Sequence, residues 1–444
     1  MVILLLLIIY LAFISLGLPD SLFGVAWPLM HIDLGLDISF APVISIIIAV
    51  CTAGVSFVAG PIIRKLGTKW VVAGSVLLTA IGMLGMSYAN HVALVVFCGV
   101  LLGIGAGVID AALNDYVSKY YGARHMSWLH GFWGVGVTIS PLVMAVFLEQ
   151  GGWRGGYAAM SYIQFGLTAV MFIAIPLWDK VQKIKEGEKV ENLVNEELKD
   201  NKADAPMVDE EVESLGKRVN KPVLDVEVGT FDKKIDGPIT DVEVEQGDKN
   251  KKQRVNIFRE KGVIFSAIAF ALYCGVEYSC GLWGASFLVQ RHSFTPALAA
   301  RYVALYYGGL MVGRFLCGAI VGKLKSQMII RIGLVVAIVG TVLLALPVPE
   351  IMLPGMLLIG FGLAPFFPTS LDLTKTRFNP AYSPDIIGFQ MGSAYAGAFI
   401  IQTLVGVISS KVSWTIYPIL LIAVSAGILV AFEMVNIRSR KART

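Results

Sequence analysis

The stretch PDSLFG, residues 19–24, has a counterpart 257 positions later in VEYSCG, residues 276–281. In this match Asp20 aligns with Glu277, and Gly24 aligns with Gly281. Two further matches keep nearly the same offset, GPIIRKL from Gly60 with GAIVGKL from Gly318, and GIGAG from Gly103 with GFGLA from Gly360. Because three weak matches share one order and one spacing, the sequence indicates two parallel repeats of similar size.

The composition is that of a membrane protein. Hydrophobic residues make up 56% of the 444 residues and charged residues only 15%, and more than half of the charges lie between Asp179 and Lys261. Spanning a bilayer takes about 20 apolar residues in a helix. Runs of that length recur twelve times, at about 2–30, 41–63, 70–89, 92–117, 128–148, 157–178, 262–290, 298–321, 327–346, 350–371, 386–410 and 412–432.

These runs predict an all-α membrane protein with twelve transmembrane helices in two pseudo-symmetric six-helix bundles. We expect the first bundle over residues 1–179 and the second over 259–436. Residues 180–258 are rich in Lys and Glu and poor in aromatic residues, which predicts a cytoplasmic, mostly disordered linker. Residues 437–444 form a basic cytoplasmic tail.

Lys and Arg in the short loops set the expected orientation. They gather on the side that carries both termini, and cytoplasmic loops are enriched in these residues. We therefore expect an integral protein of the cell (plasma) membrane, embedded in the lipid bilayer, with both termini in the cytoplasm. Nucleic acid is excluded as a partner, because the basic residues do not gather on a soluble face.

Several stretches make the sequence resemble a known family. The six-plus-six pattern with a long middle loop resembles the major facilitator superfamily, and the loop GPIIRKLGTK partly matches that family's signature, although Arg64 stands where an Asp is usual. Within the family, GLPDSLFGVAWP, GAGVIDAALNDYV, WLHGFWGVG and YCGVEYSCGLWGASFL resemble the fucose:proton symporter branch. The resemblance implies a secondary active transporter that takes up a sugar together with a proton, using Asp20, Asp110 and Asn114.

One position departs from that branch. Trp133 stands in the fifth span where the branch carries a sugar-binding Asn, so the particular sugar does not transfer.

The residues themselves also point to a buried polar site. Asp20 lies about ten residues from the outer end of the first span, or ~15 Å deep at 1.5 Å per residue. Pro19 lacks an N–H and, together with Gly17, should loosen the helix locally, as in the discontinuous helices of transport sites. A carboxyl group at that depth is costly unless it has a function. We expect Asp20 to carry the coupled proton, together with Asp110, unless Arg314 pairs with it.

Other polar and aromatic residues complete the expected site. Asp110 and Asn114 are four residues apart and should share one helix face, and Glu277 is the seventh-span counterpart of Asp20. The candidate solute contacts are Asn114, Glu277, Gln390, Trp133, Trp283, Tyr395 and His130. For the two tryptophans packing is the alternative, and His130 fits a proton relay or a packing role. The candidate gating residues are Asp115, Asp372 and Arg314.

The function expected from the sequence is therefore transport rather than catalysis. The five cysteines show no metal-binding or disulfide spacing, and no cofactor is expected beyond the proton gradient as energy source. The expected partners are a small-molecule solute and protons, and the chain should be a monomer. Proton-driven efflux and a non-transporting nutrient sensor remain open. An intramembrane aspartyl protease is disfavoured, because GLPD and GVID lack the required Gly-x-Gly-Asp setting.

Overall fold

The structure is a computed structural model that describes residues 1–121, 123–150, 152–181, 184, 257–320, 323–379 and 382–440. Nearly all of the expected linker and the end of the basic tail lie outside the described residues. Twelve helical segments are long and apolar enough to cross a membrane. Their limits follow the twelve apolar runs of the sequence within a few residues at most ends, because hydropathy and helix length are local properties.

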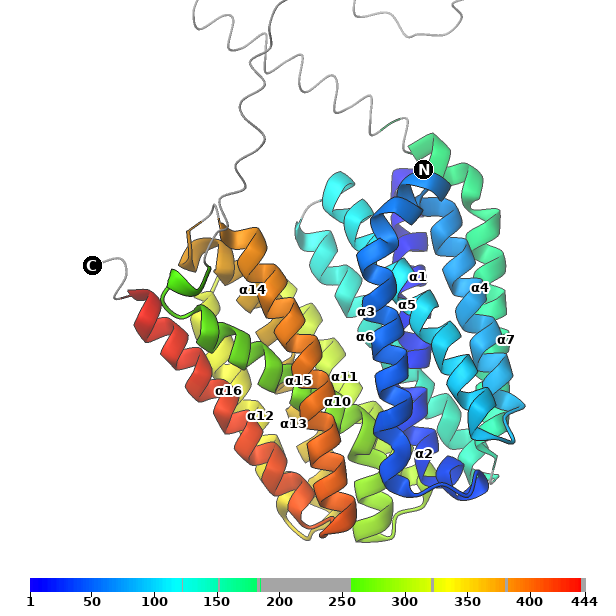
Figure 1. The fold of residues 1–444 in the computed structure, drawn as a ribbon, viewed down its shortest axis with the longest axis vertical. Coiled ribbons are helices and arrows are strands. Elements are labelled where there is room, and N and C mark those ends of the chain that lie inside the picture. The colour runs from blue at the N-terminus through cyan, green and yellow to red at the C-terminus, as the bar shows by residue number, and fades with distance from the viewer. Residues whose placement is uncertain are drawn as a thin grey trace, which may run out of the picture. The chain divides into compact units, whose positions relative to one another are not determined.

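The helices fall into two groups (Figure 1). The first bundle contains α1 (Val2–Asp20), α2 (Leu22–Asp33), α3 (Ala41–Leu66), α4 (Thr68–Ser87), α5 (Val92–Tyr120), α6 (Ala123–Glu149) and α7 (Trp153–Ile173). The second bundle contains α10 (Val263–His292), α11 (Pro296–Ile320), α12 (Ser326–Ala345), α13 (Pro349–Leu363), α14 (Phe366–Arg377), α15 (Ser383–Lys411) and α16 (Ile416–Arg440). Short 3-10 turns, η1 (Ile38–Phe40) and η2 (Ile257–Arg259), precede α3 and α10.

Two of the spans consist of two helices. The first span breaks at Ser21, between α1 and α2, directly after Pro19 and Asp20. The tenth span breaks between α13 and α14, where Pro365 precedes Phe366. A proline has no N–H to donate, so a break beside it is expected. The break in the first span confirms the interruption predicted at Pro19.

Buried polar contacts hold the first bundle together around α1. The Gln164 amide of α7 donates to the Ser15 hydroxyl of α1 at 2.9 Å and to the Thr79 hydroxyl of α4 at 2.8 Å. All three side chains are buried. Because buried polar groups are stabilising only when they are hydrogen-bonded, this triad fixes the relative positions of three helices.

The two copies of the sequence repeat contact each other at equivalent positions, where the two bundles touch. A Cβ atom added to Gly24 of α2 would overlap the carbonyl oxygen of Gly281 of α10. These are the two glycines that the 257-residue offset aligns. Equivalent residues can touch each other only near a two-fold axis, so this contact agrees with a pseudo-two-fold relation between the bundles.

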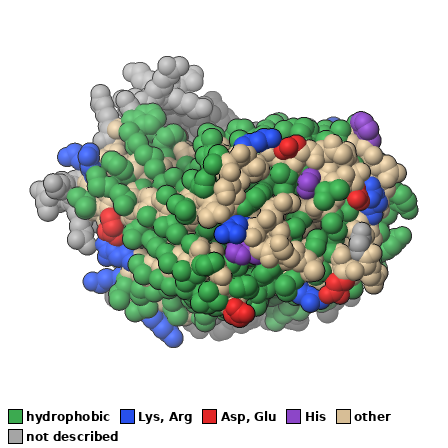
Figure 2. Space-filling view, turned by 90° about the horizontal axis from the view of Figure 1, so that it is seen from below, with side chains coloured by type: hydrophobic (Ala, Val, Ile, Leu, Met, Phe, Trp, Pro, Cys, Tyr) green, Lys and Arg blue, Asp and Glu red, His purple; other side chains and the backbone are tan. Residues whose placement is uncertain are grey.

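We call the end of the bundles that carries Val2, Val181, Ile257 and Ser439 the terminal end, and the opposite end the far end. Within the described residues, the two ion pairs that join the bundles both lie at the far end. Asp37 Oδ2 and Lys411 Nζ are 3.3 Å apart, and Glu149 pairs with Arg301. Figure 2 views the molecule from this end and shows separated charged side chains on a largely apolar and neutral surface.

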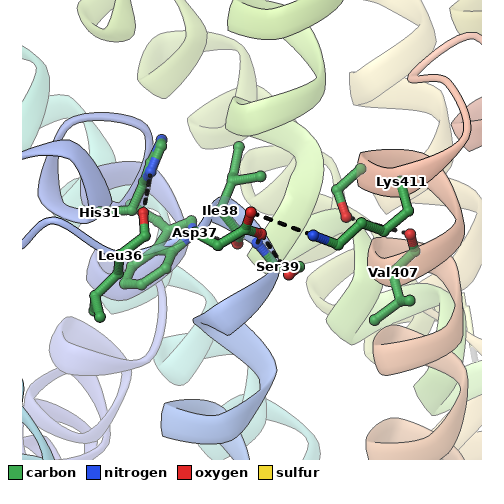
Figure 3. Close-up of polar contacts among 9 residues, drawn as sticks. His31, Leu36, Asp37, Ile38, Ser39, Val407 and Lys411 are labelled. Atoms are coloured by element: carbon green, nitrogen blue, oxygen red, sulfur yellow. Dashed lines mark hydrogen bonds and ion pairs between the residues drawn. The ribbon is translucent and has the colours of Figure 1, made fainter.

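Figure 3 shows how Asp37 is held. Lys411 extends from the end of α15 toward the loop before α3, where the Ser39 backbone N–H also donates to Asp37 at 2.8 Å. The Ser39 hydroxyl donates to the same carboxylate. These hydrogen bonds, with the Lys411 ammonium, lower the pKa of Asp37 to about 2. The Asp37 carboxylate is therefore ionised at physiological pH.

At the terminal end, the described ion pairs stay inside one bundle. Lys69 of α4 binds Asp179, and Lys119 binds Asp115 within α5. In the second bundle the guanidinium of Arg331 makes two hydrogen bonds to Glu433. Among the described residues, these pairs each join two side chains of one bundle, whereas the two far-end pairs join the bundles.

Candidate functional site

Asp20 occupies the break in the first span. Its carboxylate accepts a hydrogen bond from Trp133 Nε1 of α6 at 2.7 Å. Asp20 is exposed, although it lies in the middle of a membrane-spanning segment. No Lys or Arg side chain of the described chain lies within ion-pair distance of it, so Asp20 is a free acid with one neutral donor.

Asp110 and Asn114 form a second polar group on α5. The Asn114 amide donates to Asp110 Oδ1 at 2.9 Å, as their spacing of four residues predicts. Both side chains are partly buried, and the Asp110 charge is close enough to act on Asp20. Two carboxyl groups of the first bundle therefore share one region.

Glu277 has different surroundings from Asp20. Its carboxylate is 3.1 Å from an Arg314 guanidinium nitrogen of α11, and the two side chains are only 11% and 10% exposed. Arg314 thus pairs with Glu277 and not with Asp20. Each charge would be costly to bury alone, so the two side chains compensate each other as an ion pair.

Trp133 contacts both Asp20 and Arg314, the ion-pair partner of Glu277. Its ring lies 4.8 Å from the Arg314 guanidinium carbon, within range of a cation–π interaction. The Tyr307 ring of α11 meets the same indole edge-on, with 6.5 Å between ring centroids. Asp20 and Trp133 come from the first bundle and Arg314, Tyr307 and Glu277 from the second, so these side chains meet across the bundle interface.

Two exposed tyrosines of the second bundle lie near the acids of the first. Tyr278 of α10 is 48% exposed and lies within electrostatic range of Asp20. Tyr395 of α15 is 46% exposed and lies within range of Asp110. The free acids of the first bundle therefore face aromatic side chains of the second bundle.

Tyr278 and Tyr307 were not among the candidates predicted from the sequence. Tyr278 directly follows Glu277, and an aromatic residue flanking a carboxylate in a span is the sequence signal for it. Tyr307 sits in an apolar span with other tyrosines, and no local pattern separates it from them.

Two other candidates do not contact Asp20 or Glu277 through the hydrogen bonds that the described residues make. Gln390 is buried inside the second bundle, where its amide nitrogen donates to Ser266 at 2.6 Å and to Thr374 at 3.0 Å. Trp283 is also fully buried and donates to the Gln402 carbonyl.

The remaining candidates lie toward the terminal end. His130 is partly buried one turn below Trp133 and packs edge-on against Phe13. Asp115 pairs with Lys119 in α5, and Asp372 is exposed in α14.

The described residues contain no group of three His, Cys, Asp or Glu side chains that could hold a metal ion. All five cysteines are free, and four of them are buried. The chemistry available at the site is therefore that of carboxyl groups, amides, aromatic rings and one buried cation.

Twelve membrane-crossing helices in two repeat-related groups, with acids and aromatic side chains where the groups meet, define a membrane transporter of the two-bundle class. The chain belongs to the Major Facilitator Superfamily, whose sequence profile matches residues 9–402.

Curated relatives match parts of the chain. A putative glucose/galactose transporter of Helicobacter pylori (strain J99) is 28% identical over 36% of this chain and 39% of its own length. The glucose/mannose transporter GlcP of Bacillus subtilis (strain 168) is 22% identical over 69% of this chain and 63% of its own length. Bypass of stop codon protein 6 of Saccharomyces cerevisiae is 21% identical over 50% and 37%. The chain thus spans less than two thirds of these relatives.

Solved structures share the fold. A mutant of the nucleoside transporter NupG matches with a TM-score of 0.66 and 12% identity, over 96% of this chain and 98% of that chain. A bacterial homologue of the human lysosomal transporter Spinster matches with a TM-score of 0.61 and 12% identity, over 98% and 96%.

Proposed function

We propose that the protein takes up a sugar or related small polar solute together with a proton, by alternating access between the two bundles. One observation carries the proposal. Asp20 is an exposed acid in mid-span, with no cation beside it in the described chain and with the second bundle facing it. An intramembrane acid that is neither paired nor turned to lipid can bind and release a proton.

The side chains around Asp20 suit a sugar. Asp110 accepts hydroxyl protons, and the Asn114 amide can both donate and accept hydrogen bonds. The exposed rings of Tyr278 and Tyr395 offer apolar faces for the C–H surfaces of a sugar. The sugar-transporting relatives agree with this substrate class.

The orientation is inferred from charge. Lys and Arg of the short loops gather at the terminal end, which supports a plasma-membrane protein with both termini in the cytoplasm. The far end then faces outward, and the ion pairs Asp37–Lys411 and Glu149–Arg301 close it. Both pairs are about half exposed, and exposed pairs contribute only ~0–1 kcal/mol each. Such contacts can break in every transport cycle.

The proton gradient can supply the energy for accumulation. One charge moved through 100 mV is worth about 2.3 kcal/mol, and each pH unit adds about 1.36 kcal/mol. One proton per solute therefore supports a concentration ratio on the order of a hundredfold.

The test uses the purified full chain in vesicles with an imposed pH gradient. D-glucose, D-galactose, D-mannose, L-fucose and a nucleoside are added in turn, and internal acidification and labelled-solute uptake are followed together. We expect at least one sugar to drive proton entry in the wild type and not in Asp20→Asn. The matched control is Asp385→Asn, the same change at an exposed position of α15 at the terminal end, which should keep proton entry. Sugar-driven proton entry that persists in Asp20→Asn would contradict the proposal, and entry from the opposite side of the gradient would indicate export.

A further inference from the structure

Trp133 of α6 contacts functional groups from both bundles. Its indole N–H donates to Asp20 at 2.7 Å, and its ring lies 4.8 Å from the guanidinium carbon of Arg314. Arg314 in turn binds Glu277 at 3.1 Å. One side chain therefore touches the free acid of the first repeat and the paired cation of the second.

The backbone that carries Trp133 is fixed by close helix contact. A Cβ atom added to Gly17 of α1 would overlap the Trp133 carbonyl oxygen, and one added to Gly136 of α6 would overlap the Ile14 carbonyl oxygen. These glycines let α1 and α6 pack backbone against backbone at Trp133 and over the turn that follows it. Because the helix backbone cannot shift freely, the indole can move only by rotation of its side chain, which its contacts with Asp20, Arg314 and Tyr307 restrict.

We propose that Trp133 is a positioning residue that links proton binding at Asp20 to the Arg314–Glu277 pair. A hydrogen bond to an ionised carboxylate is roughly twice as strong as one to a neutral group. When Asp20 gains a proton, the indole is held less firmly, and the ring face under the Arg314 cation can move. The second bundle thereby responds to a proton bound in the first. This inference rests on the proposed function, in which Asp20 carries the coupled proton.

The titratable groups near the indole and Asp20 come from several helices. They are Asp110 of α5, His130 of α6, Tyr278 and Glu277 of α10, and Tyr307 and Arg314 of α11. Among the hydrogen bonds, ion pairs and ring contacts of the described residues, those of Trp133 reach both Asp20 and Arg314. The link therefore depends on this side chain.

Trp133→Phe tests the link, because phenylalanine keeps a ring beside Arg314 and removes the N–H that binds Asp20. The assay uses vesicles with D-glucose and D-galactose as probes and measures two quantities. Sugar-driven proton entry should fall about fivefold or more as the charge-assisted hydrogen bond is lost. Sugar counterflow, which needs no net proton movement, should fall by a clearly smaller factor than proton entry. The ratio of protons to sugar therefore falls.

Trp133→Leu removes both contacts and should lower the proton-to-sugar ratio and counterflow together. Trp70→Phe is the matched control, since Trp70 of α4 is 49% exposed and packs on Phe172, away from the site. It should leave both quantities unchanged.

The outcomes separate the inference from the proposed function. A wild-type ratio in Trp133→Phe or in Trp133→Leu overturns the inference alone. Equal losses of counterflow and proton entry in Trp133→Phe also overturn it, because they indicate a solute contact or a packing role. A wild type that shows no sugar-driven proton entry overturns the proposed function, and the inference with it.

Discussion

Asp20 and Glu277 occupy equivalent positions of the internal repeat, yet their surroundings differ. Asp20 is exposed and bound by the neutral Trp133 indole, whereas Glu277 is buried and paired with Arg314. The same chemical group, placed at the same depth in each half, is thus free in one bundle and neutralised in the other. The comparison shows that equivalent acids in the two halves of a repeated fold can have different partners, one a neutral donor and the other a cation.

The contrast suggests a distinct role for each acid. A free acid has no cation that holds it in place, while an acid beside a buried cation is held by its partner and provides a fixed anchor. Four residues after Asp20 and Glu277, both copies of the repeat carry a glycine, and these two glycines, Gly24 and Gly281, are in contact. At this position the close approach of the bundles leaves no room for a side chain on Gly24.

Breaking the buried pair should give the largest effect on stability. Glu277→Gln leaves the Arg314 cation buried without its partner, which we expect to cost about 3–5 kcal/mol. The measurement is thermal unfolding of the purified protein in detergent. The double variant Glu277→Gln with Arg314→Met should recover most of the loss, because no buried charge then remains unpaired. Equal instability of the double variant would show that the pair is not the cause.

The glycine contact can be tested from both sides. Gly24→Ala places a methyl group against the rigid backbone of Gly281 and should destabilise the protein by about 1–3 kcal/mol. Gly281→Ala should cost less, because its methyl group meets the end of the Tyr307 side chain, which can move. Gly74→Ala of α4 has open space around it and serves as the control. Unfolding temperatures in detergent measure all three, and a milder effect at Gly24 than at Gly281 would contradict the contact described.

The far-end pair Asp37–Lys411 should give the smallest effect. The pKa of Asp37 is lowered to about 2, so its stabilising contribution is complete above pH 4 and is lost only as the pH falls toward 2. Because the pair is exposed, Lys411→Ala should cost at most ~1 kcal/mol. Spin labels across the far end should therefore report a distance that is constant from pH 4 to 8. A change near pH 6 that disappears in Asp37→Asn would show that the pair titrates in the working range.

Much of the fold was predictable because it depends on local sequence. The twelve spans follow from runs of apolar residues, and the break after Pro19 follows from its missing N–H. The Asp110–Asn114 hydrogen bond follows from a spacing of four residues. The repeat offset also indicated that Gly24 and Gly281 are equivalent, although not that they touch.

The pairing of Arg314 was not predictable in the same way. Glu277 and Asp20 lie at similar depths, so hydropathy cannot say which of them takes the cation. That choice depends on the rotation of α10 and α11 about their axes, which brings Glu277 within 3.1 Å of Arg314. Such contacts join residues of different helices that are far apart in the sequence, so no local sequence pattern predicts them.

Gln390 shows the same limit. A glutamine in an apolar span predicts a polar contact, but the sequence does not show which face of α15 is turned inward. In the structure its amide bonds inside the second bundle to Ser266 and Thr374. Its role as a solute contact stays a prediction.

The most direct test of the division between the two acids is infrared spectroscopy of the carboxyl groups during a pH titration in vesicles. The carbonyl stretch of a protonated carboxyl group reports proton binding at one residue when variants are compared. We predict that Asp20→Asn removes a pH-dependent band that the Glu277→Gln, Arg314→Met double variant retains. A band that survives in Asp20→Asn and disappears in the double variant would contradict the account.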